Sequence, residues 1–283
     1  MALENDVFGG GVAVITGAGS GIGAGLARRA AEVGMHVVVA DIDEAAAAAV
    51  VGQIQDAGGN AEAMRVDVSQ PAELDRLAQS VFAKHGSVRL LVNNAGIETL
   101  GFAWEIPVRT WERTLDVNLH GVIHGVRAFV PRMLASGEEC WIGNLASVGS
   151  FGMMPTQSAY ILSKHAIQSF SECLFLEMEL KQAPIHVCSV IPGMIKTNIF
   201  SADLGGGEPE GAARHRTAMR EMMAAYGMDL EEGCRVMLRG MAEKKFWVSS
   251  QPDMTRDIVQ GRIDFLSNQA DPAMNEQTRA LVE

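Results

Sequence analysis

Tyr160 and Lys164 stand four residues apart in a long stretch of helical pattern that begins at Ser158. Residues at i and i+4 share one face of a helix, so the Lys164 ammonium can lie beside the Tyr160 phenol. Ser147 precedes Tyr160 by 13 residues and follows the apolar run at 141–146, which places it at the end of a strand. A phenol, an ammonium and a hydroxyl together suit proton transfer at an alcohol or carbonyl oxygen.

Residues 16–23 read Thr-Gly-Ala-Gly-Ser-Gly-Ile-Gly, directly after the first apolar run and before the first helical pattern. Glycines there allow a tight turn and let backbone N–H groups approach a pyrophosphate, which the helix N-terminus also attracts. An ordinary glycine turn is the alternative, but this placement between strand and helix favours a dinucleotide site.

Asp41 ends the second apolar run, 24 residues after Gly17. A carboxylate there would accept a hydrogen bond from a ribose 2′-hydroxyl and would repel a 2′-phosphate. Neither residues 18–20 nor the residue after Asp41 offers an Arg or Lys to offset that charge. We therefore expect NAD rather than NADP as the cofactor, the alternative being an exposed Asp that caps the next turn.

The elements that must position these side chains follow from hydrophobic patterning. Short, mostly continuous apolar runs, typical of strands covered on both faces, alternate with longer amphipathic segments. The runs lie at 12–16, 36–40, 61–66, 90–93, 141–146, 185–191 and 246–249, and the helix-like segments at 22–33, 44–57, 71–85, 108–134 and 158–180. This order predicts an α/β fold, a doubly wound parallel sheet of the Rossmann type with about seven strands and helices on both faces. No linker divides the chain, so we expect one domain over 1–283.

Several polar or glycine-containing motifs end strands of this predicted sheet. Asn94 and Gly96 follow one strand, Ser147 another, and Pro192-Gly193 a third. Because parallel strands present their carboxyl ends at one edge, where open α/β sheets bind ligands, we expect one shared site.

This motif set resembles that of the short-chain dehydrogenase/reductase family, in its single-domain branch of NAD(P)-dependent alcohol dehydrogenases and ketone reductases. The resemblance runs from about Val12 to Thr197 and rests on Thr16-Gly-x-x-x-Gly21-x-Gly23, Asn93-Asn94-Ala95-Gly96, Asn118, Ser147, Tyr160-x-x-x-Lys164 and Pro192-Gly193. It implies Tyr160 as general acid/base, Ser147 as the hydroxyl that orients the carbonyl, and Lys164 as the electrostatic partner that also bonds the nicotinamide ribose. It implies that Asn118 holds a water linking Lys164 to solvent. The implied cofactor contacts are Gly17, Ser20, Gly21, Ile22, Gly23, Asp41, Ile42, Asp67, Val68, Asn94, Ala95, Gly96, Tyr160, Lys164, Pro192, Gly193, Ile195 and Thr197.

The chemistry expected of Tyr160 also follows from its pKa. A phenol with a pKa near 10 is mostly protonated at neutral pH and is a poor base. Lowering that pKa by two units takes roughly 2.7 kcal/mol, which a close ammonium and a positive nicotinamide ring can supply. We expect Tyr160 to exchange the hydroxyl proton while the nicotinamide exchanges the hydride, without a metal.

The substrate is expected to be an apolar secondary alcohol or its ketone, aromatic or alicyclic. The predicted pocket residues are apolar apart from two, and comprise Ile97, Glu98, Val148, Met153, Met154, Gln157, Met194 and Phe200. Glu98 could instead select a polar or cationic group.

Residues 200–228 are expected to form a mobile lid, irregular at 205–211 and then helical and rich in methionine. A fixed surface loop and helix is the alternative.

Composition argues against a nucleic-acid-binding, membrane-spanning or secreted protein. A formal net charge of −11 disfavours nucleic acid as a partner, and no apolar run approaches the length of a membrane span. The first ten residues lack the pattern of a secretory signal, and the four cysteines form no C-x-x-C. We therefore expect a reduced, cytoplasmic protein.

His120 and His124 lack a third ligand at useful spacing, so they are expected to lie on a helix face rather than to bind metal.

Three alternatives stay open at this stage: a non-catalytic protein that senses a dinucleotide, a nucleotide-sugar epimerase or dehydratase, and an NADP-linked ketone reductase. The helical segments 108–134 and 158–180 carry more apolar surface than one sheet face can cover, the second through Ile161, Ile167, Phe170, Leu174 and Phe175 for example. We therefore expect a homo-oligomer, a tetramer as is common in the family or a dimer.

Overall fold

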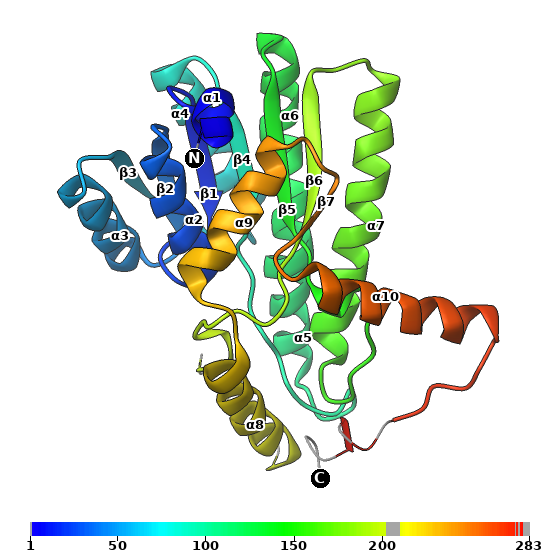
Figure 1. The fold of residues 1–283 in the computed structure, drawn as a ribbon. Coiled ribbons are helices and arrows are strands. Elements are labelled where there is room, and N and C mark those ends of the chain that lie inside the picture. The colour runs from blue at the N-terminus through cyan, green and yellow to red at the C-terminus, as the bar shows by residue number, and fades with distance from the viewer. Residues whose placement is uncertain (1, 202–209, 275, 277, 280–283) are drawn as a thin grey trace.

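The computed structural model describes residues 2–201, 210–274, 276, 278 and 279 (Figure 1). Its centre is one sheet of seven parallel strands in the order β3-β2-β1-β4-β5-β6-β7. The strands are β1 (Val12–Thr16), β2 (His36–Asp41), β3 (Asn60–Arg65), β4 (Leu90–Asn93), β5 (Cys140–Leu145), β6 (Ile185–Ile191) and β7 (Trp247–Ser249). The predicted fold class is confirmed, and each predicted strand lies within a residue of the observed one.

Successive residues of the inner strands enter two different hydrophobic cores. In β1, Val12 and Val14 pack into the core on one face, whereas Ala13 and Ile15 pack into the core on the other. Side chains alternate across a strand, so a strand covered on both faces must be apolar at every position. This is the physical reason that these strands appear as continuous apolar runs.

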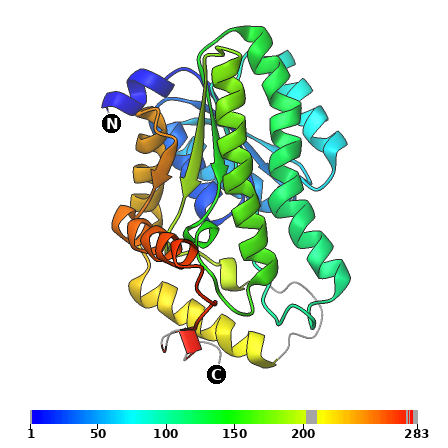
Figure 2. The same ribbon diagram turned by 90° about the vertical axis from the view of Figure 1, so that its right-hand side faces the viewer.

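Helices cover both faces of the sheet (Figures 1 and 2). One core packs against α1 (Ala2–Phe8), α2 (Gly21–Glu32), α3 (Glu44–Asp56) and α9 (Leu230–Ala242). The other packs against α4 (Pro71–His85), α6 (Gly121–Ser136) and α7 (Ser158–Leu180). The predicted bounds of α4 and α7 match the observed ones. Among the described residues, none of the helices is long and apolar enough to cross a membrane.

The segment 108–134 is not the uninterrupted α-helix that its pattern predicts. It consists of α5 (Val108–Leu115), a π-helical turn (Asp116–His120) and α6. The π turn contains Asn118, whose side chain bonds the backbone N–H and carbonyl of Ile97 at 2.8 and 2.9 Å. A π turn is most often found where function needs it, and here it holds Asn118 against the loop that follows β4.

The C-terminal third departs furthest from the sequence prediction. Residues 205–209 of the segment expected to be irregular lie outside the described residues, but Glu210 and Gly211 already belong to α8 (Glu210–Tyr226), so the prediction is wrong there. Helices α1, α9 and α10 (Pro252–Ser267) were not predicted. Two short 3-10 turns, Val148–Ser150 and Ile199–Ser201, complete the elements near the strand ends.

A buried polar chain joins β4, β5 and α7 beneath this edge. The Asn93 amide donates to Asn144 at 2.9 Å, and the Asn144 amide donates to the Ser171 hydroxyl at 3.1 Å. Gly125 on α6 leaves room for this chain, because a Cβ atom there would lie 2.1 Å from Asn93 Oδ1.

We predict that Gly125→Ala destabilises the protein by about 1–3 kcal/mol, because the added methyl group overpacks against Asn93. Gly52→Ala is the matched control: it lies in α3 with open space around the added Cβ and should stabilise by about 0.5–1 kcal/mol. Urea denaturation followed by circular dichroism measures both. Equal stability of the two variants would contradict the packing described for Gly125.

Candidate active site

The predicted catalytic side chains meet at the carboxyl end of β5. Ser147 follows β5 and caps the 3-10 turn, where its Oγ accepts a hydrogen bond from the Gly149 N–H at 3.0 Å. Ser150 then links this turn to α7: its hydroxyl accepts from the Ser147 N–H at 3.2 Å and donates to the Lys164 carbonyl at 2.8 Å. Sequence reasoning did not single out Ser150, which fixes the position of Ser147 relative to Lys164.

Lys164 is buried beside Tyr160, as the four-residue spacing predicts. Its Nζ donates to the Leu145 carbonyl at 2.7 Å and lies 5.5 Å from the centre of the Tyr160 ring. Burial lowers the pKa of Lys164 to about 8, although the Glu98 carboxylate opposes this change. The carbonyl bond anchors the ammonium at the end of β5.

The surroundings of Tyr160 favour the neutral phenol, whereas its expected role as a base requires the phenolate. Its burial raises the pKa of the phenol, the Glu98 carboxylate raises that pKa further, and a hydrogen bond with Ser147 lowers it. The chain alone therefore keeps Tyr160 protonated at neutral pH. In its expected role as a base, Tyr160 would need additional positive charge at the site.

Asn118 is fully buried, and its amide is occupied by protein groups. Besides the two bonds to Ile97, its Nδ2 contacts the Ser163 hydroxyl at 3.2 Å. Asn118 thus connects the loop after β4 to the residue before Lys164. The predicted water between Asn118 and Lys164 stays a prediction.

The glycine-rich turn has the geometry of a pyrophosphate cradle. Gly17 and Gly21 have φ angles of 62° and 51°, in the left-handed region. A Cβ on Gly17 would lie 2.6 Å from Ala95 Cα, so the two loops can meet only without a side chain there. The Asn94 amide bonds the carbonyls of Thr16 and Gly17 at 2.8 and 3.0 Å, which fixes the loop after β4 against the turn.

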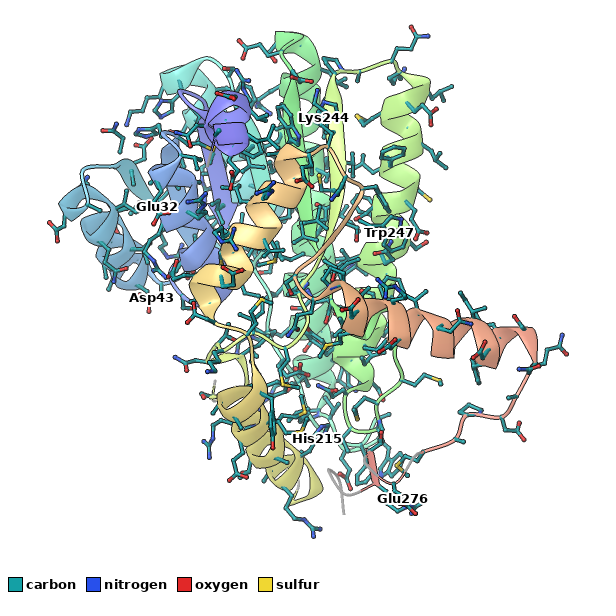
Figure 3. The ribbon with its side chains drawn as sticks, in the orientation of Figure 1. Glu32, Asp43, His215, Lys244, Trp247 and Glu276 are labelled. Carbon is teal, nitrogen blue, oxygen red and sulfur yellow. The ribbon has the colours of Figure 1, made fainter. Side chains whose placement is uncertain are left out.

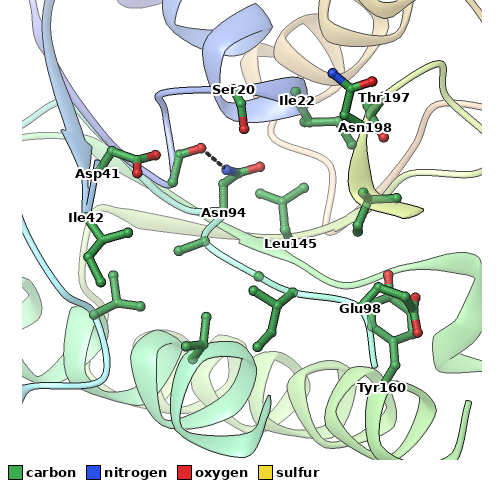
Figure 4. A pocket seen from close by; sticks show the side chains of 18 of the residues that line it. Ser20, Ile22, Asp41, Ile42, Asn94, Glu98, Leu145, Tyr160, Thr197 and Asn198 are labelled. Carbon is green, nitrogen blue, oxygen red and sulfur yellow. Dashed lines mark hydrogen bonds between the residues drawn. The ribbon is translucent and has the colours of Figure 1, made fainter. Parts of the chain in front are cut away.

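A cavity of about 580 Å³ runs along this edge of the sheet, with Asp41 and Ile42 at one end and Glu98 and Tyr160 at the other (Figure 4). Of the predicted cofactor contacts, those on its wall are Gly17, Ser20, Gly21, Ile22, Asp41, Ile42, Asp67, Val68, Asn94, Ala95, Gly96, Tyr160, Lys164, Pro192 and Thr197. The closely packed glycines and the open helix N-terminus fit a dinucleotide laid along the cavity.

Asp41 projects its carboxylate into the far end of the cavity. One oxygen accepts from the Gly19 N–H at 2.8 Å, and the other accepts from the Asp43 N–H at 2.9 Å. Each oxygen keeps a further lone pair for a ligand hydroxyl. Arg65 is paired in register with Asp41 across β2 and β3, and its guanidinium contacts Glu73 at 3.5 Å.

Three predicted cofactor residues do not line this cavity. Gly23 packs against the turn, since a Cβ there would meet the Gly17 carbonyl at 2.2 Å. Gly193 bonds Ser250 through its N–H at 3.0 Å, and Ile195 is buried in the core beside Met228. Arg113 and Asn198 do line the cavity, but no motif in the sequence marked them.

Among the predicted substrate residues, Ile97 and Glu98 are on the wall of the cavity, and Met153 is exposed elsewhere. Phe200 and Met194 belong to a small apolar cluster beside it, which also contains Leu100, Ala212, Ile199, Met219 and Met223. Helix α8 therefore packs its methionines on this cluster. Gln157 is buried and bonds Glu98, whereas Val148 and Met154 are partly exposed.

The two histidines considered as metal ligands have other partners. His120 Nδ1 contacts Asp116 at 2.8 Å, and His124 Nδ1 contacts the Val68 carbonyl at 3.2 Å. Within the described part of the chain, one group could offer three metal ligands, His36, Glu62 and His85. It does not line the cavity, and the Lys84 ammonium occupies the second oxygen of Glu62.

Comparison with known proteins identifies the family to which the chain belongs. Residues 11–204 match the model of the short chain dehydrogenase family, and the chain belongs to that family. It is 38% identical over 194 residues to "Probable oxidoreductase EphD" of Mycobacterium tuberculosis, and the match covers 69% of this chain. The match spans about a third of that relative's length, 32%.

Two solved structures illustrate what such folds bind. A short chain dehydrogenase/reductase from Burkholderia phymatum in complex with NAD has a TM-score of 0.91 and 31% identity, covering 95% of this chain and 98% of its own. A metagenomic short-chain oxidoreductase in complex with NADP has a TM-score of 0.63 and 33% identity, covering 67% of this chain and 85% of its own. One of these two similar structures thus holds NAD and the other holds NADP.

Proposed function

We propose that this protein is an NAD-dependent dehydrogenase that interconverts a secondary alcohol and its ketone. The observation that carries the proposal is the grouping of Ser147, Tyr160 and Lys164 after β5, with Tyr160 and Lys164 on the wall of a cavity whose shape suits a dinucleotide. A dinucleotide sensor would need the cavity but not this group. A nucleotide-sugar epimerase is disfavoured by the match to the short chain dehydrogenase model.

Each side chain has one task in this reaction. The nicotinamide, when bound, supplies the hydride chemistry. Ser147 donates a hydrogen bond to the substrate oxygen, where negative charge changes most during the reaction. Tyr160 exchanges the hydroxyl proton, and Lys164 stabilises the phenolate from its fixed position on the Leu145 carbonyl. Asn118 and Ser150 keep the two loops and α7 in register.

Asp41 supports NAD as the preferred dinucleotide. Its carboxylate would accept the 2′-hydroxyl of an adenine ribose, whereas a 2′-phosphate would face a negative charge at that end of the cavity. NADP is the second candidate, because Arg65 lies beside Asp41 in the sheet and one similar structure holds NADP. Asp41 lines the cavity and Arg65 does not, so NAD is favoured.

The substrate is proposed to be largely apolar, with an aromatic or alicyclic body. The cluster of Phe200, Met194, Met219 and Met223 adjoins the cavity through Ile199, and methionine adapts to irregular shapes. The four cysteines are free, and three are buried, which fits a reducing compartment such as the cytoplasm.

We also propose a homo-oligomer, built on an exposed stripe of α7. Of the apolar residues that the sequence suggested on this helix, Ile167 and Leu174 are buried in the core, whereas Phe175 is exposed. Leu162, Ser169, Cys173, Leu176 and Leu180 recur at helical spacing and are exposed in the single chain. Leu176 is 61% exposed and Leu180 84%. A row of leucines and small residues on a 23-residue helix suits packing against a second copy of the same helix.

We predict that Tyr160→Phe lowers kcat by at least about a hundredfold, because the proton donor and acceptor is removed. NAD binding, measured by calorimetry, should change little. Tyr226→Phe is the matched control, since Tyr226 is 79% exposed and is the other tyrosine of the chain. Near-normal turnover by the Tyr160 variant, measured as NADH formation, would refute the proposed mechanism.

We predict that the unaltered enzyme has a higher kcat/KM with NAD than with NADP, and that Asp41→Ser reduces this preference at least about tenfold by removing the repulsive charge. Asp43→Ser is the control, because Asp43 caps α3 two residues away and does not line the cavity. Equal use of both dinucleotides by the unaltered enzyme would show that Asp41 does not select the cofactor.

We predict that the protein is a stable oligomer at micromolar concentration and that Leu176→Arg dissociates it, because a charge would be buried without a partner. Light scattering coupled to size exclusion reports the mass, and circular dichroism reports whether the variant is folded. A monomeric parent protein, or a folded variant of unchanged mass, would exclude this surface as the interface.

A further inference from the structure

Glu98 is a glutamate buried in the wall of the cavity, where a purely apolar substrate would give its carboxyl group no partner. It lies two residues after Gly96, is 2% exposed, and lines the same cavity as Tyr160. Figure 4 shows its carboxyl group at the Tyr160 end of the cavity, away from the end formed by Asp41. Its position is therefore beside the reacting group and not beside the adenine end.

The protein satisfies only part of the Glu98 carboxyl group. The Gln157 side chain and the Thr99 backbone bond it, but Oε1 has no hydrogen-bond partner among the described residues. Burial raises the pKa of Glu98 to about 8. The two hydrogen bonds and the charges of Arg216 and Lys164 lower this pKa, but burial has the larger effect. This pKa favours the acid form of Glu98 at neutral pH, which can both donate and accept a hydrogen bond.

This arrangement has two costs. A buried oxygen without a partner is unfavourable, and an ionised Glu98 raises the pKa of Tyr160, which opposes phenolate formation. An apolar side chain of similar size would avoid both. Costs of this kind are typical of functional sites, where a ligand completes the bonding.

His215 adds a second polar group to the same region. It is fully buried on α8 and bonds Thr156, the neighbour of Gln157, at 2.5 Å through Nδ1. Figure 3 places it on the side of α8 that faces the rest of the molecule. Its Nε2 has no hydrogen-bond partner among the residues that the structure describes. The surroundings of Glu98 are thus not purely apolar.

We propose that Glu98 binds a second hydroxyl group of the substrate, close to the carbinol carbon that is oxidised, so that diols and hydroxyketones are preferred over simple alcohols and ketones. This inference rests on the proposed function. A hydroxyl group can bond Oε1 with either protonation state of Glu98. A substrate ammonium is disfavoured because the positive charges of Lys164 and Arg216 already face Glu98.

The test compares 1-phenylethanol with 1-phenylethane-1,2-diol, which differ by one hydroxyl, as substrates of the enzyme with NAD. The diol should have a kcat/KM about 10 to 100 times higher, the usual loss when a buried polar group is left unpaired. In Glu98→Leu the ratio should fall to about 1, and Glu98→Gln should retain part of it, because its amide can still bond the hydroxyl. Glu105→Gln, an exposed glutamate outside the cavity, should leave the ratio unchanged.

A binding measurement separates this inference from the proposed reaction. Calorimetry on Tyr160→Phe with NAD should show tighter binding of the diol than of 1-phenylethanol, and Tyr160→Phe combined with Glu98→Leu should abolish the difference. This result supports the inference even if neither alcohol is oxidised. Oxidation of both alcohols with a ratio that does not depend on Glu98 would overturn the inference alone. A preference for 2-amino-1-phenylethanol over the diol, or equal binding of diol and 1-phenylethanol, would also overturn it.

Discussion

The site depends on keeping a phenol and an ammonium side by side in a largely dehydrated place. Burial favours the neutral form of each, so it raises the pKa of Tyr160 and lowers that of Lys164 to about 8. The roles proposed for them require the charged forms, a phenolate next to an ammonium. The Leu145 carbonyl holds the ammonium in place at 2.7 Å, and the Ser147 hydrogen bond favours the phenolate. A cationic ring at the same site would supply the remaining stabilisation.

The rest of the fold positions this pair. Parallel strands bring the ends of β4 and β5 to one edge, and bonds from Ser150 and Asn118 then fix α7 against both loops. Asn94 joins the loop after β4 to the glycine turn after β1, so the catalytic end and the pyrophosphate cradle share one rigid frame. The same buried polar bonds therefore hold both the fold and the proposed site together.

The strands, α4 and α7 could be predicted from the sequence because burial on both faces produces continuous apolar runs, and because Pro71 and a long amphipathic pattern define the helices. The π turn at Asp116–His120 could not be predicted, since it depends on Asn118 reaching Ile97 in the folded chain. Helices α9 and α10 were missed because the sequence after Phe200 lacks clear strand-helix alternation. The group of Ser147, Tyr160 and Lys164 was predicted, whereas the burial of Glu98 beside it needed the structure.

The chain alone keeps Tyr160 protonated, and in the proposed reaction bound NAD⁺ makes Tyr160 ionise more easily. The chain has two tyrosines, so Tyr226→Phe leaves Tyr160 as the sole source of a tyrosinate absorbance signal. The direct measurement is a spectrophotometric titration of this variant with and without saturating NAD⁺. We predict that Tyr160 without NAD⁺ ionises above the ordinary phenol value of about 10, and that NAD⁺ lowers its pKa by at least about one unit. A pKa that is the same in both states would contradict the account.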